Sequence, residues 1–125
     1  MLKLTEMKTR KEMKEEYKQK KFKMGVFQIK NNSNGKFFVG SSLDLIAIWH
    51  AQKLQLNNGM HPNIELQKDW KDFGWENFSY EILDEISQNE DKPIDYAKEI
   101  KTLETLIIDE LQPFEQRGYN IQPKK

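Results

Sequence analysis

The segment 25–42 most restricts the fold that this chain can adopt. Two short apolar runs, 25–30 and 37–42, flank a turn segment rich in Asn, Ser and Gly. Asn and Gly tolerate positive φ, whereas Val and Phe favour a pleated strand, so the segment predicts a β-hairpin. Gly40 lets the chain turn at the end of the hairpin. Ser41 and, three residues later, Asp44 fit a capping box, which predicts that a helix follows directly.

Size and composition indicate one folded domain. A chain of 125 residues is long enough for one hydrophobic core. Charged residues make up 32% of it, but three Trp, four Tyr and seven Phe argue against disorder. The absence of Cys excludes a disulfide framework and a thiolate metal site, and no segment resembles a signal peptide or a membrane span. We therefore expect a cytoplasmic protein with no membrane partner.

Positive charge is concentrated at the N-terminus. Residues 1–24 carry nine Lys or Arg and four Glu, whereas the rest of the chain carries eleven and sixteen. Residues 1–22 lack Gly and Pro and have only a thin apolar stripe, which predicts a basic helical arm, 1–22, attached to a domain, 23–125. Its basic residues could contact a phosphate backbone. The alternative is that the arm is a solvated helix that covers one flank of the domain.

The remaining apolar spacing predicts three helices and one strand. Helices are expected at about 43–57, from 61–63 to Gly74, and at 93–112, and a strand is expected at 77–86. In the second helix the apolar positions are Ile64, Leu66, Trp70 and Phe73. With a hairpin in front, this order predicts an α+β fold: a three-stranded, mainly antiparallel sheet with flanking helices and an irregular tail that packs back on the domain.

Two polar residues interrupt apolar helix faces. Gln52 shares a face with Leu45, Ile48, Trp49 and Leu56, where it either hydrogen-bonds in a pocket or lies at the edge of a buried stripe. Glu104 falls on the inward stripe of the last helix. Because burial of an unpaired charge is costly, Glu104 needs a metal ion, a basic side chain or a wet cleft beside it.

The ordered motifs resemble the GIY-YIG nuclease family. Gly25-Val26-Phe27 is followed by Phe38-Val39-Gly40 and Ser41-Ser42. The resemblance continues to residue 121, through Gly59-Met60-His61-Pro62-Asn63, Leu66-Gln67, Asp69-Trp70, Gly74, Phe78, Glu104, Ile108 and Gly118-Tyr119-Asn120. The ending 111–120 is similar to a divergent subgroup found alone or attached to LuxR- and ArsR-type regulators.

The resemblance implies hydrolysis of a DNA phosphodiester with one divalent metal, Mg²⁺ or Mn²⁺. Glu104 matches the metal ligand, and His61 matches the histidine before the second helix. Phe27 and Phe38 stand at the two tyrosine positions, Ile48 at the phosphate-binding arginine, and Gln52 where a first-helix histidine is often found. Phenylalanine cannot position or deprotonate water, and isoleucine cannot neutralise charge on a phosphate, so the expected site is degenerate.

Three functions follow from these residues. The first is a catalytically weak or inactive module that binds DNA or another nucleic acid through Lys30, Lys36, Lys53, Ser41 and Ser42. The second is a metal-dependent DNA endonuclease with a rearranged site, in which Glu104 holds the metal and His61 or Tyr119 acts as base. The third is a module that binds a protein partner or a small ligand in the newly apolar cleft.

Overall fold

A computed structural model describes residues 22–87 and 95–122, so the predicted arm, 1–22, falls outside the described residues except for its last position. In chain order the elements are β1 (Met24–Asn31), β2 (Phe37–Ser42), α2 (Leu45–Asn57), α3 (Ile64–Phe73), the 3₁₀ turn η2 (Trp75–Asn77), β3 (Phe78–Ile86) and α4 (Tyr96–Leu111). The predicted order of strands and helices is confirmed. Within the described ranges, no helix has the length and apolar character needed to cross a bilayer.

The three strands form one antiparallel sheet in the order β2-β1-β3. In the hairpin, Phe27 lies opposite Gly40 and Ile29 lies opposite Phe38. On the other side of β1 the register shifts between Val26 and Phe27, which marks a bulge. These pairings confirm the predicted α+β fold.

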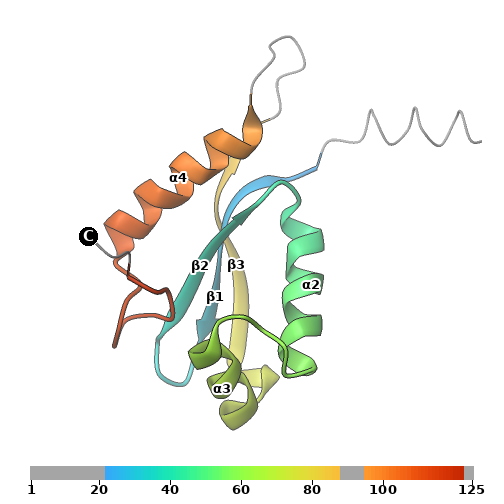
Figure 1. The fold of residues 1–125 in the computed structure, drawn as a ribbon, viewed down its shortest axis with the longest axis vertical. Coiled ribbons are helices and arrows are strands. Elements are labelled where there is room, and N and C mark those ends of the chain that lie inside the picture. Colours follow the sequence, from blue (N-terminus) through green and yellow to red (C-terminus); the bar gives the residue numbers. More distant parts are fainter. Residues whose placement is uncertain (1–21, 88–94, 123–125) are drawn as a thin grey trace, which may run out of the picture.

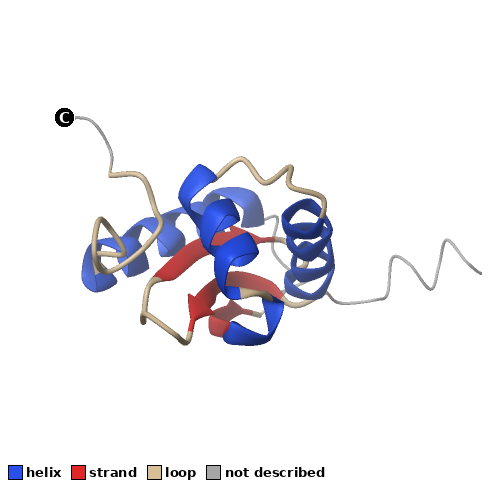
Figure 2. Cartoon of the chain, turned by 90° about the horizontal axis from the view of Figure 1, so that it is seen from below, coloured by secondary structure: helices blue, strands red, loops and turns tan. Residues whose placement is uncertain are grey.

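The sheet is covered by helices on both faces (Figures 1 and 2). Because side chains alternate along a strand, Phe27 and Ile29 share one face, where they pack in a buried cluster with residues of α2 and α3. Val26 and Val39 belong to the opposite face and are also buried. α4 lies against β1 and β2, and its buried Ile100 belongs to this side. The domain therefore has a larger core under α2 and α3 and a smaller one under α4.

Helix α3 contacts the larger core through fewer residues than its pattern indicated. Of its four apolar positions, Leu66 and Trp70 are buried, but Ile64 and Phe73 are exposed. A short helix has only one side against the core, and Leu66 and Trp70 occupy that side.

The cap of α2 also differs from the prediction. Asp44 is the N-cap, and its carboxylate accepts hydrogen bonds from the backbone N–H groups of Ile46 and Ala47, at 3.2 and 3.0 Å. The side chain of Ser42 contacts the backbone of Asp44, while Ser41 lies within β2. The capping residue is thus Asp44 itself, which is in the preferred N-cap class.

The tail packs back on the domain along the free edge of β2. The backbone N–H of Tyr119 donates to the carbonyl of Phe37 at 2.9 Å, and the side chain of Asn120 bonds both the N–H and the carbonyl of Val39, at 2.8 and 2.9 Å. A Cβ atom on Gly118 would lie 2.5 Å from the carbonyl oxygen of Phe37, so only glycine fits there. The tail therefore satisfies backbone groups that an edge strand would leave exposed.

Candidate functional site

Phe27 is part of the larger core. It is buried, its ring lies 5.4 Å from that of Tyr80, and it crosses β2 over Gly40. A Cβ atom on Gly40 would lie 2.6 Å from Cζ of Phe27, which is the carbon that carries the hydroxyl in a tyrosine. The close approach of strand and ring explains the glycine, and the position holds no polar group.

Phe38 and Ile48 join the same apolar surface. Both are half-buried and pack against the larger core. Three positions that the family resemblance assigns to two tyrosines and an arginine therefore carry hydrocarbon side chains in contact with the core. None of the three can accept or donate a hydrogen bond to a phosphate or to water.

His61 is buried between Phe38 and Gln52. Its ring meets that of Phe38 edge-on, with centroids 5.8 Å apart. Nδ1 accepts the backbone N–H of Asn63 at 3.0 Å, so Nε2 carries the proton that bonds Oε1 of Gln52. Burial lowers the pKa of His61, which favours the neutral ring. Both nitrogens are thus engaged within the domain. Of the two alternatives for Gln52, the structure shows a hydrogen bond, and its partner is His61.

Glu104 reaches β2 from α4. The hydroxyl of Ser41 donates to Oε2 of Glu104, and Nζ of Lys101 lies 3.2 Å from the same oxygen. The side chain of Glu104 is 19% exposed, against 71% for Lys101. Ser41 follows Gly40 in β2 and points to the α4 face, whereas the ring of Phe27 covers Gly40 from the other face. Glu104 thus contacts Ser41 on one face of β2, and Phe27 contacts the preceding residue, Gly40, on the other face.

A metal ion at this point would have Glu104 as its protein ligand. Among residues 22–87 and 95–122, no group of three or more His, Cys, Asp or Glu side chains could hold a metal. Mg²⁺ commonly keeps several waters and is bound by one or two carboxylates together with substrate phosphates. A single carboxylate would therefore supply only one of the protein ligands that such an ion can use. Lys101 would have to move away from Oε2 of Glu104, because its ammonium occupies that oxygen. A metal held there would supply positive charge to a phosphate.

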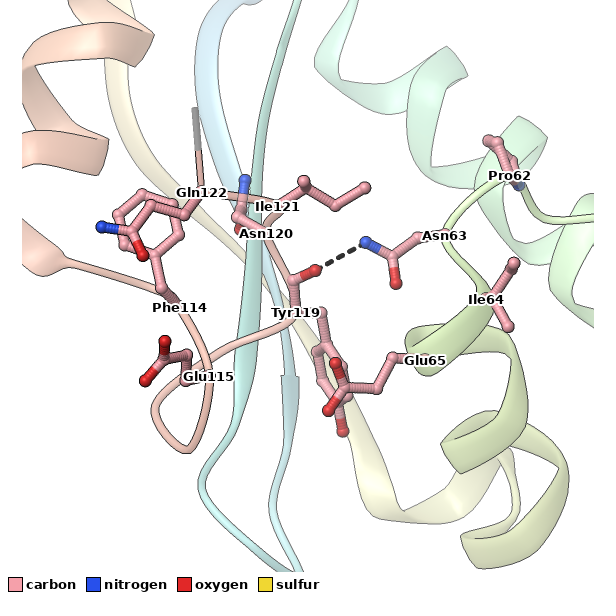
Figure 3. Close-up of a pocket in the computed structure, with 10 residues that line it drawn as sticks. All are labelled: Pro62, Asn63, Ile64, Glu65, Phe114, Glu115, Tyr119, Asn120, Ile121 and Gln122. Carbon is pink, nitrogen blue, oxygen red and sulfur yellow. Dashed lines mark hydrogen bonds between the residues drawn. The ribbon is translucent and has the colours of Figure 1, made fainter. Parts of the chain in front are cut away.

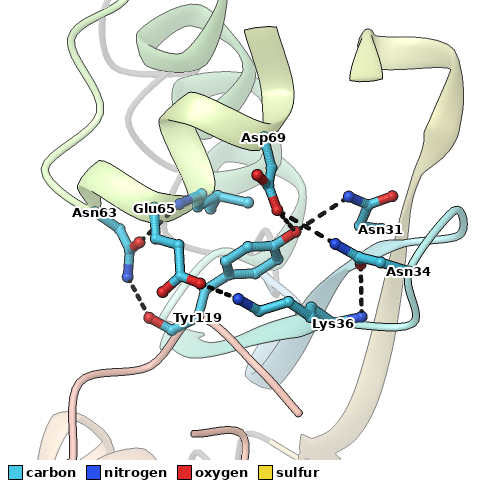
Figure 4. A network of polar contacts seen from close by, with 8 residues as sticks. Asn31, Asn34, Lys36, Asn63, Glu65, Asp69 and Tyr119 are labelled. Carbon is cyan, nitrogen blue, oxygen red and sulfur yellow. Dashed lines mark hydrogen bonds and ion pairs between the residues drawn. The ribbon is translucent and has the colours of Figure 1, made fainter. Parts of the chain in front are cut away.

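Tyr119 lies in a polar network that joins the tail, the hairpin turn and α3 (Figure 4). Its buried hydroxyl donates to Asp69 at 2.7 Å and accepts from the side-chain amide of Asn31 at 3.2 Å. Its backbone carbonyl accepts from the side chain of Asn63 at 2.7 Å. Burial, with the hydrogen bond to Asp69, raises the pKa of Tyr119 to about 12. This phenol therefore keeps its proton at neutral pH.

Three of the five residues predicted to contact nucleic acid have side chains engaged inside the domain. Lys36 is 15% exposed; it pairs with Glu65, and its Nζ lies 4.8 Å from the ring centroid of Tyr119. The hydroxyls of Ser41 and Ser42 contact Glu104 and the backbone of Asp44. Lys30 is half-buried, and Lys53 lies over the ring of Trp49 at 5.0 Å.

A cavity of about 380 Å³ lies beside the network, between the start of α3 and the tail (Figure 3). Tyr119 is the only predicted site residue that lines it; Glu104, His61 and the five predicted nucleic-acid contacts do not. The remaining lining residues are Pro62, Asn63, Ile64, Glu65, Phe114, Glu115, Asn120, Ile121 and Gln122. The cavity is thus separate from the positions at which the resemblance places chemistry.

Comparison with known proteins identifies the family. No family model matches the chain. The structure matches the catalytic domain of homing endonuclease I-TevI with a TM-score of 0.65 and 34% identity, over 80% of this chain and 99% of that domain. The chain belongs to the GIY-YIG nuclease family. A point mutant of the I-TevI catalytic domain matches this GIY-YIG chain with a TM-score of 0.66 and 33% identity, over 83% and 98% of the two chains.

A curated relative extends the comparison. Intron-associated endonuclease 1 of enterobacteria phage T4 is 35% identical over 100 residues, which cover 79% of the GIY-YIG chain. The chain spans 37% of the length of that endonuclease. GIY-YIG endonucleases generally depend on a divalent metal. Membership of the subgroup attached to LuxR- and ArsR-type regulators stays a prediction.

Sequence reasoning missed the role of Asn120 and the network around Tyr119. The side chain of Asn120 bonds the backbone of Val39 as a neighbouring strand would. In the network, Asn31, Asp69 and Tyr119 come from three distant segments. The one sequence signal was the Gly118-Tyr119-Asn120 motif, which located the tail but not its contacts.

Proposed function

We propose that this GIY-YIG domain binds nucleic acid and has weak or no nuclease turnover. The observation that carries the proposal is the packing of Phe27, Phe38 and Ile48 against the core, at the positions where the family has two tyrosines and an arginine. Loss of one transition-state hydrogen-bond donor typically costs about 10²–10³ in rate. Losses within one site are not additive, but no base and no phosphate clamp remain at these positions.

The two candidate substitute bases support the same conclusion. A general base needs a free lone pair near the proton that it takes. In His61, Nδ1 already accepts a backbone N–H and Nε2 carries the proton that bonds Gln52. Tyr119 is buried and its pKa is raised to about 12, so its anion is scarce at neutral pH. Neither side chain is poised to activate water in this arrangement.

For the binding surface we assign Lys30 and Lys53 to phosphate contact, with the Lys and Arg residues of 1–21 as further contacts. Lys36 serves as a matched comparison because its ammonium is held by Glu65 and the ring of Tyr119. Relatives with endonuclease activity make nucleic acid the expected ligand class.

The test is fluorescence anisotropy of the full chain with single- and double-stranded DNA and RNA across a salt series. Affinity should fall with salt, and Lys30→Gln and Lys53→Gln should each reduce the slope of log K against log salt by about 1. Lys36→Gln should change the slope less. The same samples with Mg²⁺ or Mn²⁺ should show no cleavage above background. Absence of binding to every oligonucleotide at low ionic strength would overturn the proposal.

A metal-dependent endonuclease is the second candidate, and the partly exposed carboxylate of Glu104 beside Ser41 favours it. Cleavage by this route should require Mg²⁺ or Mn²⁺ and disappear in Glu104→Gln. Metal should also raise the melting temperature of the natural chain more than that of Glu104→Ala, because an ion that binds only the folded state stabilises it. Cleavage that survives Glu104→Gln would point to another site or a contaminant.

The partly buried Phe38 and Ile48 leave a third outcome for these experiments. If neither nucleic acid nor metal binds, the surface made by Phe38 and Ile48 becomes the candidate site for a protein partner or a small apolar ligand.

A further inference from the structure

The carboxylate of Glu104 has a cation in contact with it. Two donors meet at its Oε2: the hydroxyl of Ser41, and the ammonium of Lys101, whose Nζ lies 3.2 Å away. Lys101 precedes Glu104 by three residues, so both side chains leave the same side of α4. The side chain of Glu104 is 19% exposed and that of Lys101 is 71% exposed. The carboxylate is thus held against β2, and its cation faces solvent.

These two contacts oppose a second cation at Glu104. A partly buried carboxylate needs positive charge or hydrogen-bond donors beside it, and Lys101 and Ser41 supply both. The sequence left a metal ion, a basic side chain or a wet cleft as partners for Glu104, and the structure has the basic side chain. A divalent ion added beside Lys101 would leave the site with net positive charge. Repulsion between the two cations therefore weakens metal binding while Lys101 is present.

The exposed side of α4 around Lys101 also suits a polyanion. Lys98, Lys101, Thr102 and Thr105 lie on this side, three or four residues apart, and all of them are exposed. The hydroxyls of Thr102 and Thr105 donate to the backbone carbonyls of Lys98 and Lys101, at 3.0 and 2.9 Å. None of these positions is acidic. A phosphate can therefore reach the ammonium of Lys101 without passing another carboxylate on this side of α4.

The ammonium of Lys101 can bind the carboxylate and a phosphate at the same time. A lysine nitrogen carries several N–H donors, and lysine is a common phosphate ligand because its charge is compact and its stem is flexible. Glu104 engages one side of the ammonium, and the high exposure of the side chain leaves the other side open to solvent. Lys101 can thus give a phosphate the positive charge that a metal ion supplies in related sites.

We propose that the Lys101 ammonium takes the place of a divalent metal at Glu104 and contacts a phosphate of the bound nucleic acid. Glu104, itself held by Ser41, positions the ammonium. This inference rests on the proposed nucleic-acid binding. Two consequences follow from it: the natural chain binds nucleic acid without using Mg²⁺ or Mn²⁺, and removal of the Lys101 ammonium opens Glu104 to a metal ion.

Fluorescence anisotropy of the full chain, with the oligonucleotide that binds most tightly, tests the phosphate contact. One neutralised phosphate contributes about 0.9 to the slope of log K against log salt, so Lys101→Gln should bind about eightfold more weakly at about 0.1 M salt. Its slope should fall by about 1. Millimolar Mn²⁺ at constant ionic strength should restore the affinity of Lys101→Gln but should not raise that of Lys98→Gln, the control with the same change in charge. Lys101→Gln combined with Glu104→Gln should show no restoration.

Thermal unfolding without nucleic acid tests the exclusion of metal separately. Mn²⁺ should raise the melting temperature of Lys101→Gln more than that of the natural chain or of Lys98→Gln, because an ion that binds only the folded state stabilises it. Equal shifts, an unchanged salt slope in Lys101→Gln, or a gain in affinity of the natural chain with Mn²⁺ that Glu104→Gln abolishes would each overturn the inference. Failure of every oligonucleotide to bind would overturn the proposed function and the phosphate contact, whereas the melting temperatures would still decide whether Lys101 excludes metal.

Discussion

Tyr119→Phe removes one buried hydroxyl and tests whether the tail is held by its polar network. The hydroxyl donates to the carboxylate of Asp69 and accepts from the side-chain amide of Asn31. A hydrogen bond to a charged group contributes about 1.5–3 kcal/mol, and a buried amide left without a partner costs about 1–3 kcal/mol. Asp69 keeps a second contact, from Asn34 at 3.3 Å, and these costs overlap. We expect a loss of about 2–3 kcal/mol in the free energy of unfolding.

Tyr80→Phe is the matched control. It deletes the same hydroxyl from another tyrosine, whose single partner is the backbone carbonyl of Leu45. A hydrogen bond between neutral groups contributes about 1 kcal/mol, so this variant should lose about half as much or less. Urea unfolding of both variants gives the comparison, with a shifted midpoint and an unchanged slope. Equal losses in the two variants would refute the importance of the network.

A pH series adds a second readout to the same variant. The pKa of Tyr119 is raised to about 12 in the folded chain and lies near 10 in the unfolded chain. The resulting stabilisation is complete below pH 10 and is lost as pH rises through 12. Tyr119→Phe should therefore lose less stability than the natural chain between pH 10 and 12.

Two further predictions concern contacts of Phe38 with His61 and of Phe27 with Gly40. Burial lowers the pKa of His61, so the unfolded chain binds the proton first, and stability should fall as pH drops below 6.5. The urea midpoint of His61→Asn should therefore depend less on pH between 7 and 5 than that of the natural chain, and an equal dependence would contradict this role of His61. Gly40→Ala would place Cβ 2.6 Å from Cζ of Phe27 and should cost about 1–3 kcal/mol, measured by urea unfolding. Adding Phe27→Leu should recover part of that loss, and strictly additive losses would contradict the proposed clash.

Local patterns in the sequence were sufficient for the elements of this fold. The hairpin depends on turn residues and alternating strands, and its register follows from contacts over a few residues. The limits of α3 were also predictable, because Asn63 caps its start and Gly74 ends it. The side of α3 that meets the core was not predictable, because the periodicity places Ile64 and Leu66 in the same helix without fixing which one is buried.

Contacts across long stretches of chain could not be read from such patterns. Asn31 and Tyr119 are 88 residues apart, and Asp69 and Tyr119 are 50 apart. No local rule relates them. The requirement that Glu104 have a partner was predictable from the cost of burying charge, but the identity of Ser41 as that partner was not. The motif placed Ser41 at a helix cap, whereas the side-chain alternation of β2 turns it toward α4.

The tail that lines β2 has a consequence for how the chain folds. The hairpin forms from residues close together in sequence, but its outer strand is completed only by Tyr119 and Asn120, about 80 residues later. Contacts between such distant residues raise the contact order of the native state and slow folding, because a large loop must close first. During synthesis, the edge of β2 stays exposed until Gly118 has emerged from the ribosome. In this period β2 is most open to pairing with another strand.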